Sequence, residues 1–187
     1  MKKIMVVLVA LLAACFLPCF LYAQEGEWRM RAVVVGNGDY KRFPTLNFAL
    51  EDAKSIYEFL LAPEGAGLKE HEVKYVRNAS RSEIYEALQW LKDNVRENER
   101  VLFYYSGHGQ AEEDAQKRRC AYLVPVDALT DNLAETAVAL EDRQGRKGLE
   151  TELWELPALQ VALVLDSCYS GTQVCQEGKK GLKAGVS

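Results

Sequence analysis

The stretch Val161–Gly171, V-A-L-V-L-D-S-C-Y-S-G, decides the fold of this chain. Its first five residues form an apolar run of strand length, rich in branched side chains, that ends abruptly at Asp166-Ser167-Cys168. Such a run is typical of a strand buried on both faces of a parallel sheet, although a short apolar run alone does not exclude a helix. A cysteine at the carboxyl end of such a strand lies where open α/β sheets place their ligand crevices.

A second stretch follows the same pattern. Residues 101–105 form an apolar run that ends in Ser106-Gly107-His108-Gly109. Two parallel strands would therefore bring His108 and Cys168, 60 positions apart (168 − 108), to the same edge of the sheet. Alone, each residue has a plain structural explanation, as a turn histidine or a packed thiol. Together, each after a strand and beside small residues, they indicate a thiolate–imidazole catalytic pair.

The rest of the chain alternates between strand-like and helix-like segments, which predicts an α/β fold with a mainly parallel sheet and helices on both faces. The glycine-rich turn after the first strand lacks the dinucleotide and phosphate-loop patterns, so we expect no nucleotide site. We expect strands at 29–35, 73–76, 101–105, 122–126 and 161–165, helices at 47–61, 80–96 and 149–156, a charged surface loop at 111–119, and a polar, partly helical segment at 132–146.

Residues 1–23 have the pattern of an export signal. Lys2 and Lys3 precede an apolar stretch at 4–22, and Ala23 is a small residue suited to cleavage. Three outcomes stay open: a cleaved signal peptide, a lipoprotein signal that leaves Cys15 lipidated, and an uncleaved membrane anchor. Each places the domain at 28–187 outside the cytoplasm, in the periplasm, outside the cell or attached to a membrane.

Charge and cysteine content narrow the function classes. The chain holds 23 basic and 27 acidic residues, and removal of Lys2 and Lys3 leaves 21 basic residues and a net charge of −6. No basic patch stands out before the C-terminal tail, so we expect no nucleic-acid partner. Beyond the leader, three cysteines remain, an odd number that indicates a free thiol in an exported protein. Pairing of Cys120 with Cys175 stays open.

Five segments carry a resemblance to a known family: R-A-V-V-V-G-N-G-D-Y at 31–40, Leu46 with Ala49, Asp52 and Ala53, Y-Y-S-G-H-G-Q at 104–110, Y-L-V-P-V-D at 122–127, and L-D-S-C-Y-S-G at 165–171. The chain resembles the caspase-like cysteine peptidases, the clan of caspases, metacaspases and paracaspases (family C14), from about residue 30 to 172. The cysteine segment is closer to the metacaspase and bacterial versions. The resemblance implies a three-layer α/β/α sandwich, of which this chain contains the large-subunit portion.

The resemblance also implies roles for individual residues. Cys168 would attack the scissile carbonyl, and His108 would protonate the leaving amine. The backbone amides of Gly109 and Cys168 would hold the oxyanion. Asp166 matches the acid that lines the primary specificity pocket of relatives that cut after Arg or Lys, and Asp52 matches a second pocket acid. An exposed helix carboxylate is an equally good interpretation of Asp52.

The sequence departs from the family at two places. Where calcium-activated metacaspases carry acidic clusters, this chain has Arg119-Cys120 and Thr151-Glu152, so we expect no metal site and no cofactor. The last two strands and the pocket loops of the family's small subunit are missing. Three explanations stay open: the sequence is a fragment, the gene is truncated, or a second chain supplies the strands and completes the sheet. The first hypothesis is an endopeptidase that cuts peptide or protein substrates; the rival is a non-catalytic peptide-binding or assembly module with the same fold.

Overall fold

A computed structural model describes residues 29–113, 117 and 119–167 of the chain. The predicted leader at 1–23, the predicted nucleophile Cys168, and Cys175 lie outside these residues. No helix within the described ranges is long and apolar enough to cross a membrane.

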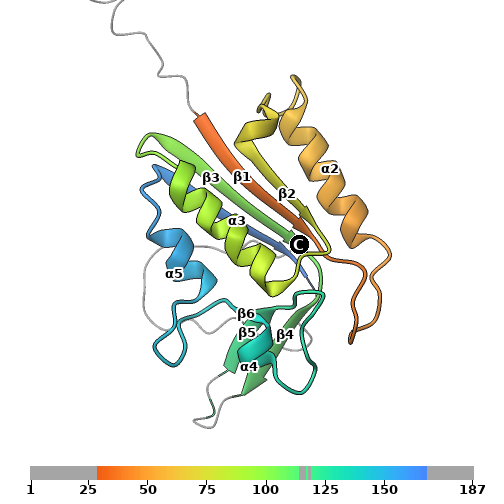
Figure 1. The fold of residues 1–187 in the computed structure, drawn as a ribbon. Coiled ribbons are helices and arrows are strands. Elements are labelled where there is room, and N and C mark those ends of the chain that lie inside the picture. Colours follow the sequence, from red (N-terminus) through yellow and green to blue (C-terminus); the bar gives the residue numbers. More distant parts are fainter. Residues whose placement is uncertain (1–28, 114–116, 118, 168–187) are drawn as a thin grey trace, which may run out of the picture.

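A four-stranded parallel sheet forms the centre of the fold, in the order β2-β1-β3-β7 (Figure 1). Each strand matches one predicted from the sequence, extended by one or two residues at one or both ends. The α/β class and the mainly parallel sheet are therefore confirmed. The strands are β1 (Arg29–Gly36), β2 (Val73–Arg77), β3 (Glu99–Ser106) and β7 (Gln160–Asp166).

Helices cover both faces of this sheet, as expected (Figure 1). Helix α2 (Ala49–Leu61) packs on one face, where Ala53 and Leu60 meet Ala32 and Val34 of β1. Helices α3 (Arg81–Asn94) and α5 (Leu149–Trp154) pack on the other. A capping box begins α3: Glu83 N–H donates to the Ser80 hydroxyl, and the Glu83 carboxylate accepts from Ser80 N–H at 2.8 Å. A short 3₁₀ turn, η1 (Glu70–Glu72), leads into β2.

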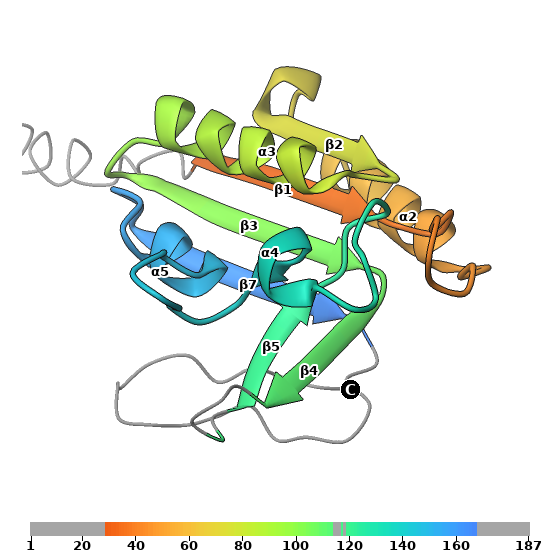
Figure 2. The same cartoon turned by 60° about the horizontal axis from the view of Figure 1, so that its bottom comes forward.

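A smaller antiparallel sheet extends from the carboxyl end of β3 (Figure 2). It contains β4 (Gly109–Glu113), β5 (Arg119–Leu123) and β6 (Val138–Ala139), next to the short helix α4 (Leu133–Thr136). The prediction of a surface loop at 111–119 and a strand at 122–126 was thus wrong in its boundaries. Because Glu113 and Arg119 lie on an exposed ribbon, their charge does not oppose strand formation.

The strand that leads to the cysteine is covered on one face only. Along β7, exposed residues alternate with half-buried ones, and Val164 keeps 42% of its surface exposed. The half-buried residues pack against the α3–α5 core, whereas within the described part of the chain no helix covers their neighbours on the α2 side. The expectation of burial on both faces is therefore wrong for the described residues.

The loop after β1 joins the two sheets through one buried side chain. Asn37 has no exposed surface; its amide donates to the carbonyls of Ala79 (3.2 Å) and Val124 (3.3 Å), and its oxygen accepts from Ala79 N–H at 2.7 Å. Gly36, just before it, has no room for a side chain because a Cβ would lie 2.6 Å from that of Ala53. Asn37 thus connects the end of β1, the start of α3 and the segment after β5.

Asn37→Ala should lower the free energy of unfolding by about 2 kcal/mol, because it leaves the buried Ala79 N–H without a partner. The carbonyls of Ala79 and Val124 each lose one donor but keep their bonds to Val126 N–H and the Tyr105 hydroxyl. Urea unfolding at constant m-value measures the change. Asn94→Ala is the control, since Asn94 makes one half-buried bond to Trp90 O. Equal losses in the two variants would contradict this role for Asn37.

Candidate active site

His108 lies directly after β3, and its ring is held by the loop that follows β1. The Nε2 atom is 2.8 Å from the carbonyl oxygen of Pro44, and the ring centroid is 4.6 Å from that of Tyr40 and 5.8 Å from that of Phe43. Because a carbonyl only accepts, Nε2 carries the proton and donates. In the neutral ring this leaves Nδ1 as the proton acceptor.

Two tyrosine hydroxyls hold the backbone of His108 from either side. The Tyr40 hydroxyl accepts from His108 N–H at 2.7 Å, and the Tyr105 hydroxyl donates toward the carbonyls of His108 (3.0 Å) and Val124 (2.8 Å). Burial raises the pKa of Tyr40, so its hydroxyl stays protonated over the physiological range. The position of the imidazole is thus fixed by both its ring and its backbone.

Gly107 is required between Tyr105 and His108. A Cβ at this position would lie 2.6 Å from the hydroxyl oxygens of both Tyr40 and Tyr105, so any side chain would displace the two groups that hold His108. Gly107 N–H also donates to the carbonyl of Asp166 at 3.2 Å. This bond extends the pairing of β3 and β7 one residue past the end of β3.

The register of β3 and β7 relates the two predicted catalytic residues. Ser106 pairs with Asp166, so His108 and Cys168 each come two residues after one paired position. Cys168 itself lies outside the described residues, and its distance from His108 stays a prediction. The structure describes the two segments that lead to them, which run side by side up to Ser106 and Asp166.

Asp166 is exposed at the end of β7, and Tyr104 of β3 donates to its Oδ2 at 3.2 Å. Burial raises the pKa of the Tyr104 hydroxyl to about 12, and the Asp166 and Asp52 carboxylates add to the increase. The hydroxyl therefore remains a donor to Asp166 at neutral pH. Asp52 is exposed in the first turn of α2, and its effect on Tyr104 indicates that it belongs to the same electrostatic environment.

Gly109 begins β4 opposite Leu123 of β5. The bond from Val124 N–H to the His108 carbonyl flanks this pair, which makes it a non-hydrogen-bonded pair of the antiparallel ladder. In such a pair the N–H groups point away from the partner strand. The Gly109 amide is therefore directed out of the β4–β5 ribbon and remains a candidate oxyanion donor.

Arg42 is an exposed residue of the loop after β1, and Cys120 is buried in β5. Among residues 29–113, 117 and 119–167, no group of three or more His, Cys, Asp or Glu side chains could hold a metal ion.

Comparison with known proteins identifies the family. A family model described as "Caspase domain" matches residues 29–184. The chain belongs to this family of caspase-like cysteine peptidases. It is 25% identical over 154 residues to Metacaspase-1 of Kluyveromyces lactis, which covers 77% of this chain and 34% of that protein. It is 27% identical over 171 residues to Metacaspase-1 of Cryptococcus neoformans, covering 83% and 35%.

A solved structure shares the fold of this chain. The crystal structure of protein GSU0716 from Geobacter sulfurreducens matches with a TM-score of 0.57 at 19% identity, over 77% of this chain and 52% of that one. The chain spans about a third of the length of the curated relatives it matches.

The sequence did not reveal the residues that hold the site in place. Tyr40, Tyr104 and Tyr105 belong to the segments that resemble the family, but nothing in their spacing indicated that their hydroxyls contact His108 or Asp166. The adjacent pair Tyr104-Tyr105, just before Ser-Gly-His-Gly, could have indicated these contacts. Because successive strand residues point to opposite faces, the pair places one tyrosine hydroxyl on each face of the sheet next to His108. The Pro44 carbonyl left no signal, since any residue supplies a carbonyl.

Tyr104→Phe should flatten the alkaline loss of stability. In the folded chain Tyr104 keeps its proton up to about pH 12, but its hydroxyl ionises near pH 10.0 once unfolded. Between these values the unfolded state binds fewer protons, so Tyr104 makes stability fall as pH rises. The variant should be less stable by about 1 kcal/mol at pH 8, and the gap should narrow above pH 10. Urea unfolding at several pH values measures this; parallel curves would contradict it.

Proposed function

We propose that this domain is a cysteine endopeptidase with Cys168 as nucleophile and His108 as general acid and base, and that it cuts after Arg or Lys. The observation that carries the proposal is the fixed position of His108. Its Nε2 is bound to Pro44, its backbone is held by Tyr40 and Tyr105, and it lies two residues beyond the Ser106–Asp166 pair. Cys168 follows the same pair on the neighbouring strand.

The chemistry follows from the tautomer of His108. With Nε2–H donated to Pro44, Nδ1 is the nitrogen that takes the thiol proton of Cys168. The thiolate attacks the peptide carbonyl and forms a C–S bond; the C–N bond then breaks as His108 passes the proton to the leaving amine. Water, deprotonated by the same imidazole, hydrolyses the thioester and returns the thiol.

The oxyanion formed during attack needs backbone donors close to the thiol. The outward direction of the Gly109 amide supports its assignment to this role, together with the amide of Cys168. The Gly109 amide comes one residue after His108, and the second amide belongs to Cys168 itself. The proposed donors and the proposed dyad therefore depend on the same strand ends for their positions.

Specificity for a basic residue rests on the α2 side of β3. Tyr104 fixes one carboxylate oxygen of Asp166 at 3.2 Å, and Asp52 adds a second negative charge in the same environment. Two carboxylates suit a guanidinium fork or an ammonium group through charge-assisted hydrogen bonds. The same charges disfavour an acidic side chain.

We also propose that the domain works outside the cytoplasm, because residues 1–23 have the pattern of an export signal or anchor. The free edge of β7 in the described sheet supports completion by the small-subunit strands, in this protein or from a second chain. The rival, a non-catalytic binding module, would retain the fold without peptide hydrolysis.

Cys168→Ala and His108→Ala should each reduce kcat/KM for an arginyl peptide at least about a thousandfold, because the two residues act as one unit. Circular dichroism should stay unchanged. His71→Ala is the control, since His71 is exposed in η1, far along the chain from the site. Protein completed with the small-subunit part is used throughout. Substantial hydrolysis by either dyad variant would contradict the mechanism. If the parent protein neither hydrolyses the peptide nor reacts with a thiol-directed arginyl warhead, the non-catalytic binding module is favoured.

Asp166→Ala should lower kcat/KM for arginyl peptides by roughly thirtyfold, or about 2 kcal/mol. We expect a value at the low end for a charged contact because Asp166 is exposed. Labelling of Cys168 by a small uncharged alkylating agent should change little. The exposed Asp131 gives the control variant Asp131→Ala. A parent enzyme that prefers matched aspartyl peptides would refute the pocket and leave the dyad intact.

A further inference from the structure

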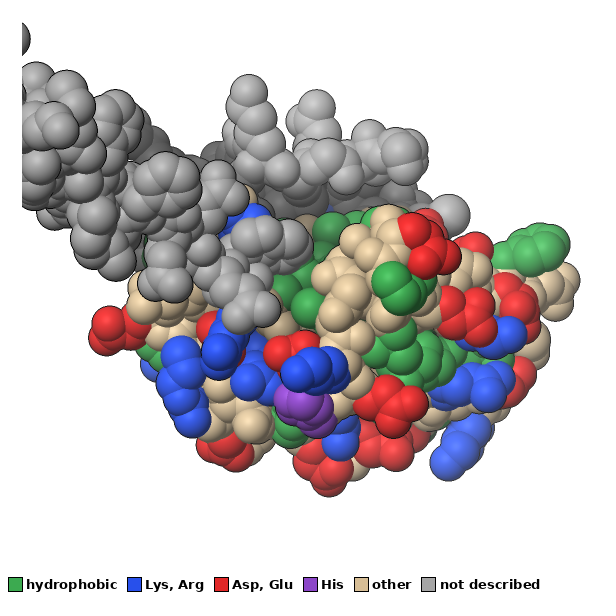
Figure 3. All heavy atoms as spheres, turned by 90° about the horizontal axis from the view of Figure 1, so that it is seen from above, with side chains coloured by type: hydrophobic (Ala, Val, Ile, Leu, Met, Phe, Trp, Pro, Cys, Tyr) green, Lys and Arg blue, Asp and Glu red, His purple; other side chains and the backbone are tan. Residues whose placement is uncertain are grey.

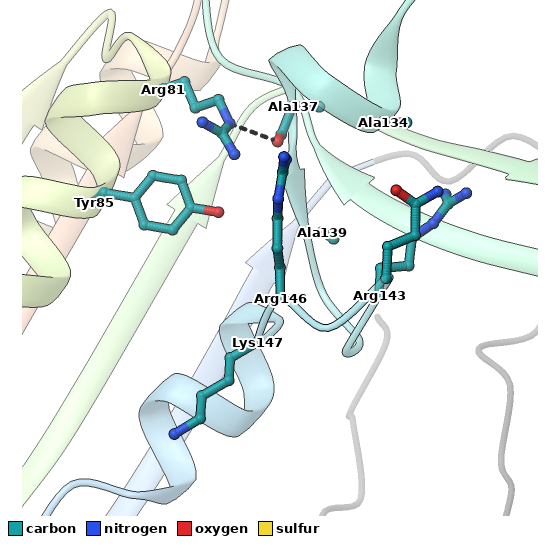
Figure 4. A pocket seen from close by; sticks show the side chains of 9 residues that line it. Arg81, Tyr85, Ala134, Ala137, Ala139, Arg143, Arg146 and Lys147 are labelled. Atoms are coloured by element: carbon teal, nitrogen blue, oxygen red, sulfur yellow. Dashed lines mark hydrogen bonds between the residues drawn. The ribbon is translucent and has the colours of Figure 1, made fainter.

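A shallow pocket lies apart from the residues of the proposed active site, between α3, β6 and the hairpin that follows β6 (Figure 4). It is open to solvent, and its empty space of about 380 Å³ includes part of that solvent. Three alanines, Ala134, Ala137 and Ala139, line it together with Tyr85 of α3.

The charged side chains that line this pocket are all cationic. Four of its nine lining residues are cationic, Arg81, Arg143, Arg146 and Lys147, and none of the nine is acidic. This contrasts with a chain in which acidic residues outnumber basic ones, 27 to 23. It also contrasts with the face in Figure 3, where acidic and basic side chains lie interspersed over the described residues. A local excess of cations in an acidic protein favours an anionic ligand.

Arg81 is fixed in place before any ligand arrives. Its Nε donates to the Ala137 carbonyl at 3.1 Å, and its guanidinium carbon lies 4.9 Å from the centre of the Tyr85 ring. Its backbone N–H is bound by the Asp127 carboxylate at 3.0 Å. The Nε bond uses one of the five donors of the guanidinium. The two terminal nitrogens supply the other four.

The hairpin at 143–146 delivers the second arginine. Arg143 and Arg146 bridge each other across a two-residue turn in which Gln144 (φ 48°) and Gly145 (φ 76°) are both left-handed. Figure 4 shows Arg146 pointing toward Arg81 and the Ala137 carbonyl, with the Tyr85 hydroxyl directed at the same space. Lys147 extends toward α5, where it pairs with Glu155, and Arg143 lies on the other side of the hairpin, over the Tyr122 ring.

One carboxylate competes for this space. Glu135 of α4 accepts from Arg146 Nη1 at 2.8 Å, and both side chains are about half exposed. An exposed ion pair of this kind contributes little stability, so an incoming anion displaces it at small cost. Glu135 therefore marks where an anionic group contacts Arg146.

We propose that Arg81, Arg146 and the Tyr85 hydroxyl form a binding site for a phosphate group, carried by a small phosphorylated molecule. Two guanidinium groups that approach from different elements can each bind two oxygens of a tetrahedral oxyanion. A carboxylate has only two oxygens, which one guanidinium satisfies, whereas a tetrahedral phosphate presents oxygens to two guanidinium groups at once. The site shares no residue with the proposed peptidase centre.

Calorimetric titration of the whole chain with inorganic pyrophosphate, at low ionic strength, tests the proposal. We expect saturable binding of one pyrophosphate per chain and an affinity that falls with added salt. Citrate, an anion that carries carboxylates alone, should bind at least tenfold more weakly. No saturable binding of pyrophosphate, or tighter binding of citrate, would overturn the assignment.

Variants at the exposed Arg146–Glu135 pair give opposite expectations. Arg146→Gln should weaken pyrophosphate binding at least fivefold, and Glu135→Gln should tighten it, because it removes the competing carboxylate. The exposed Lys54–Glu58 pair on α2 provides controls of equal charge change, Lys54→Gln and Glu58→Gln, which should leave the affinity unchanged. If the two pairs of variants shift the affinity equally, the effect is one of net charge and the site is refuted.

Discussion

The structure depends on one line of backbone pairing at the carboxyl edge of the parallel sheet. Gly36 pairs with both Arg77 and Ser106, and Ser106 pairs with Asp166, so all four strands end at the same level. Evenly matched parallel strands bring every loop that follows them to one edge. The segments that carry His108, Asn37 and the predicted nucleophile therefore start from a common line. A shift of register by one residue would offset the segment that leads to His108 from the segment that leads to Cys168.

Buried polar groups hold the two sheets together beyond this line. The Val124 carbonyl accepts from both Asn37 and the Tyr105 hydroxyl, and Val124 N–H donates to the His108 carbonyl. Each of these groups would be costly to bury unpaired, so the loops have few alternative arrangements. The histidine is thus rigid because it belongs to the connection between the large and the small sheet.

The two faces of β3 have separate tasks. Tyr105 points toward the α3–α5 core and holds His108, whereas Tyr104 points toward the α2 side and holds Asp166. Alternation along one strand thereby separates the residue proposed to move protons from those proposed to recognise the substrate. The cationic pocket lies on yet another part of the molecule, where α3 meets the hairpin at 143–146. Occupation of that pocket need not disturb either task.

The sequence by itself determined the order of strands and helices, the parallel sheet, the family and the edge at which His108 lies, because apolar runs and the residues that end them are local signals. It failed at 111–119, where charged residues form a ribbon, and at β7, whose exposed face depends on which helices lie near it. Only the tertiary structure decided that the Pro44 carbonyl orients His108 and that Tyr104 binds Asp166. These contacts join residues more than 60 positions apart, and no local pattern specifies a distance across the fold.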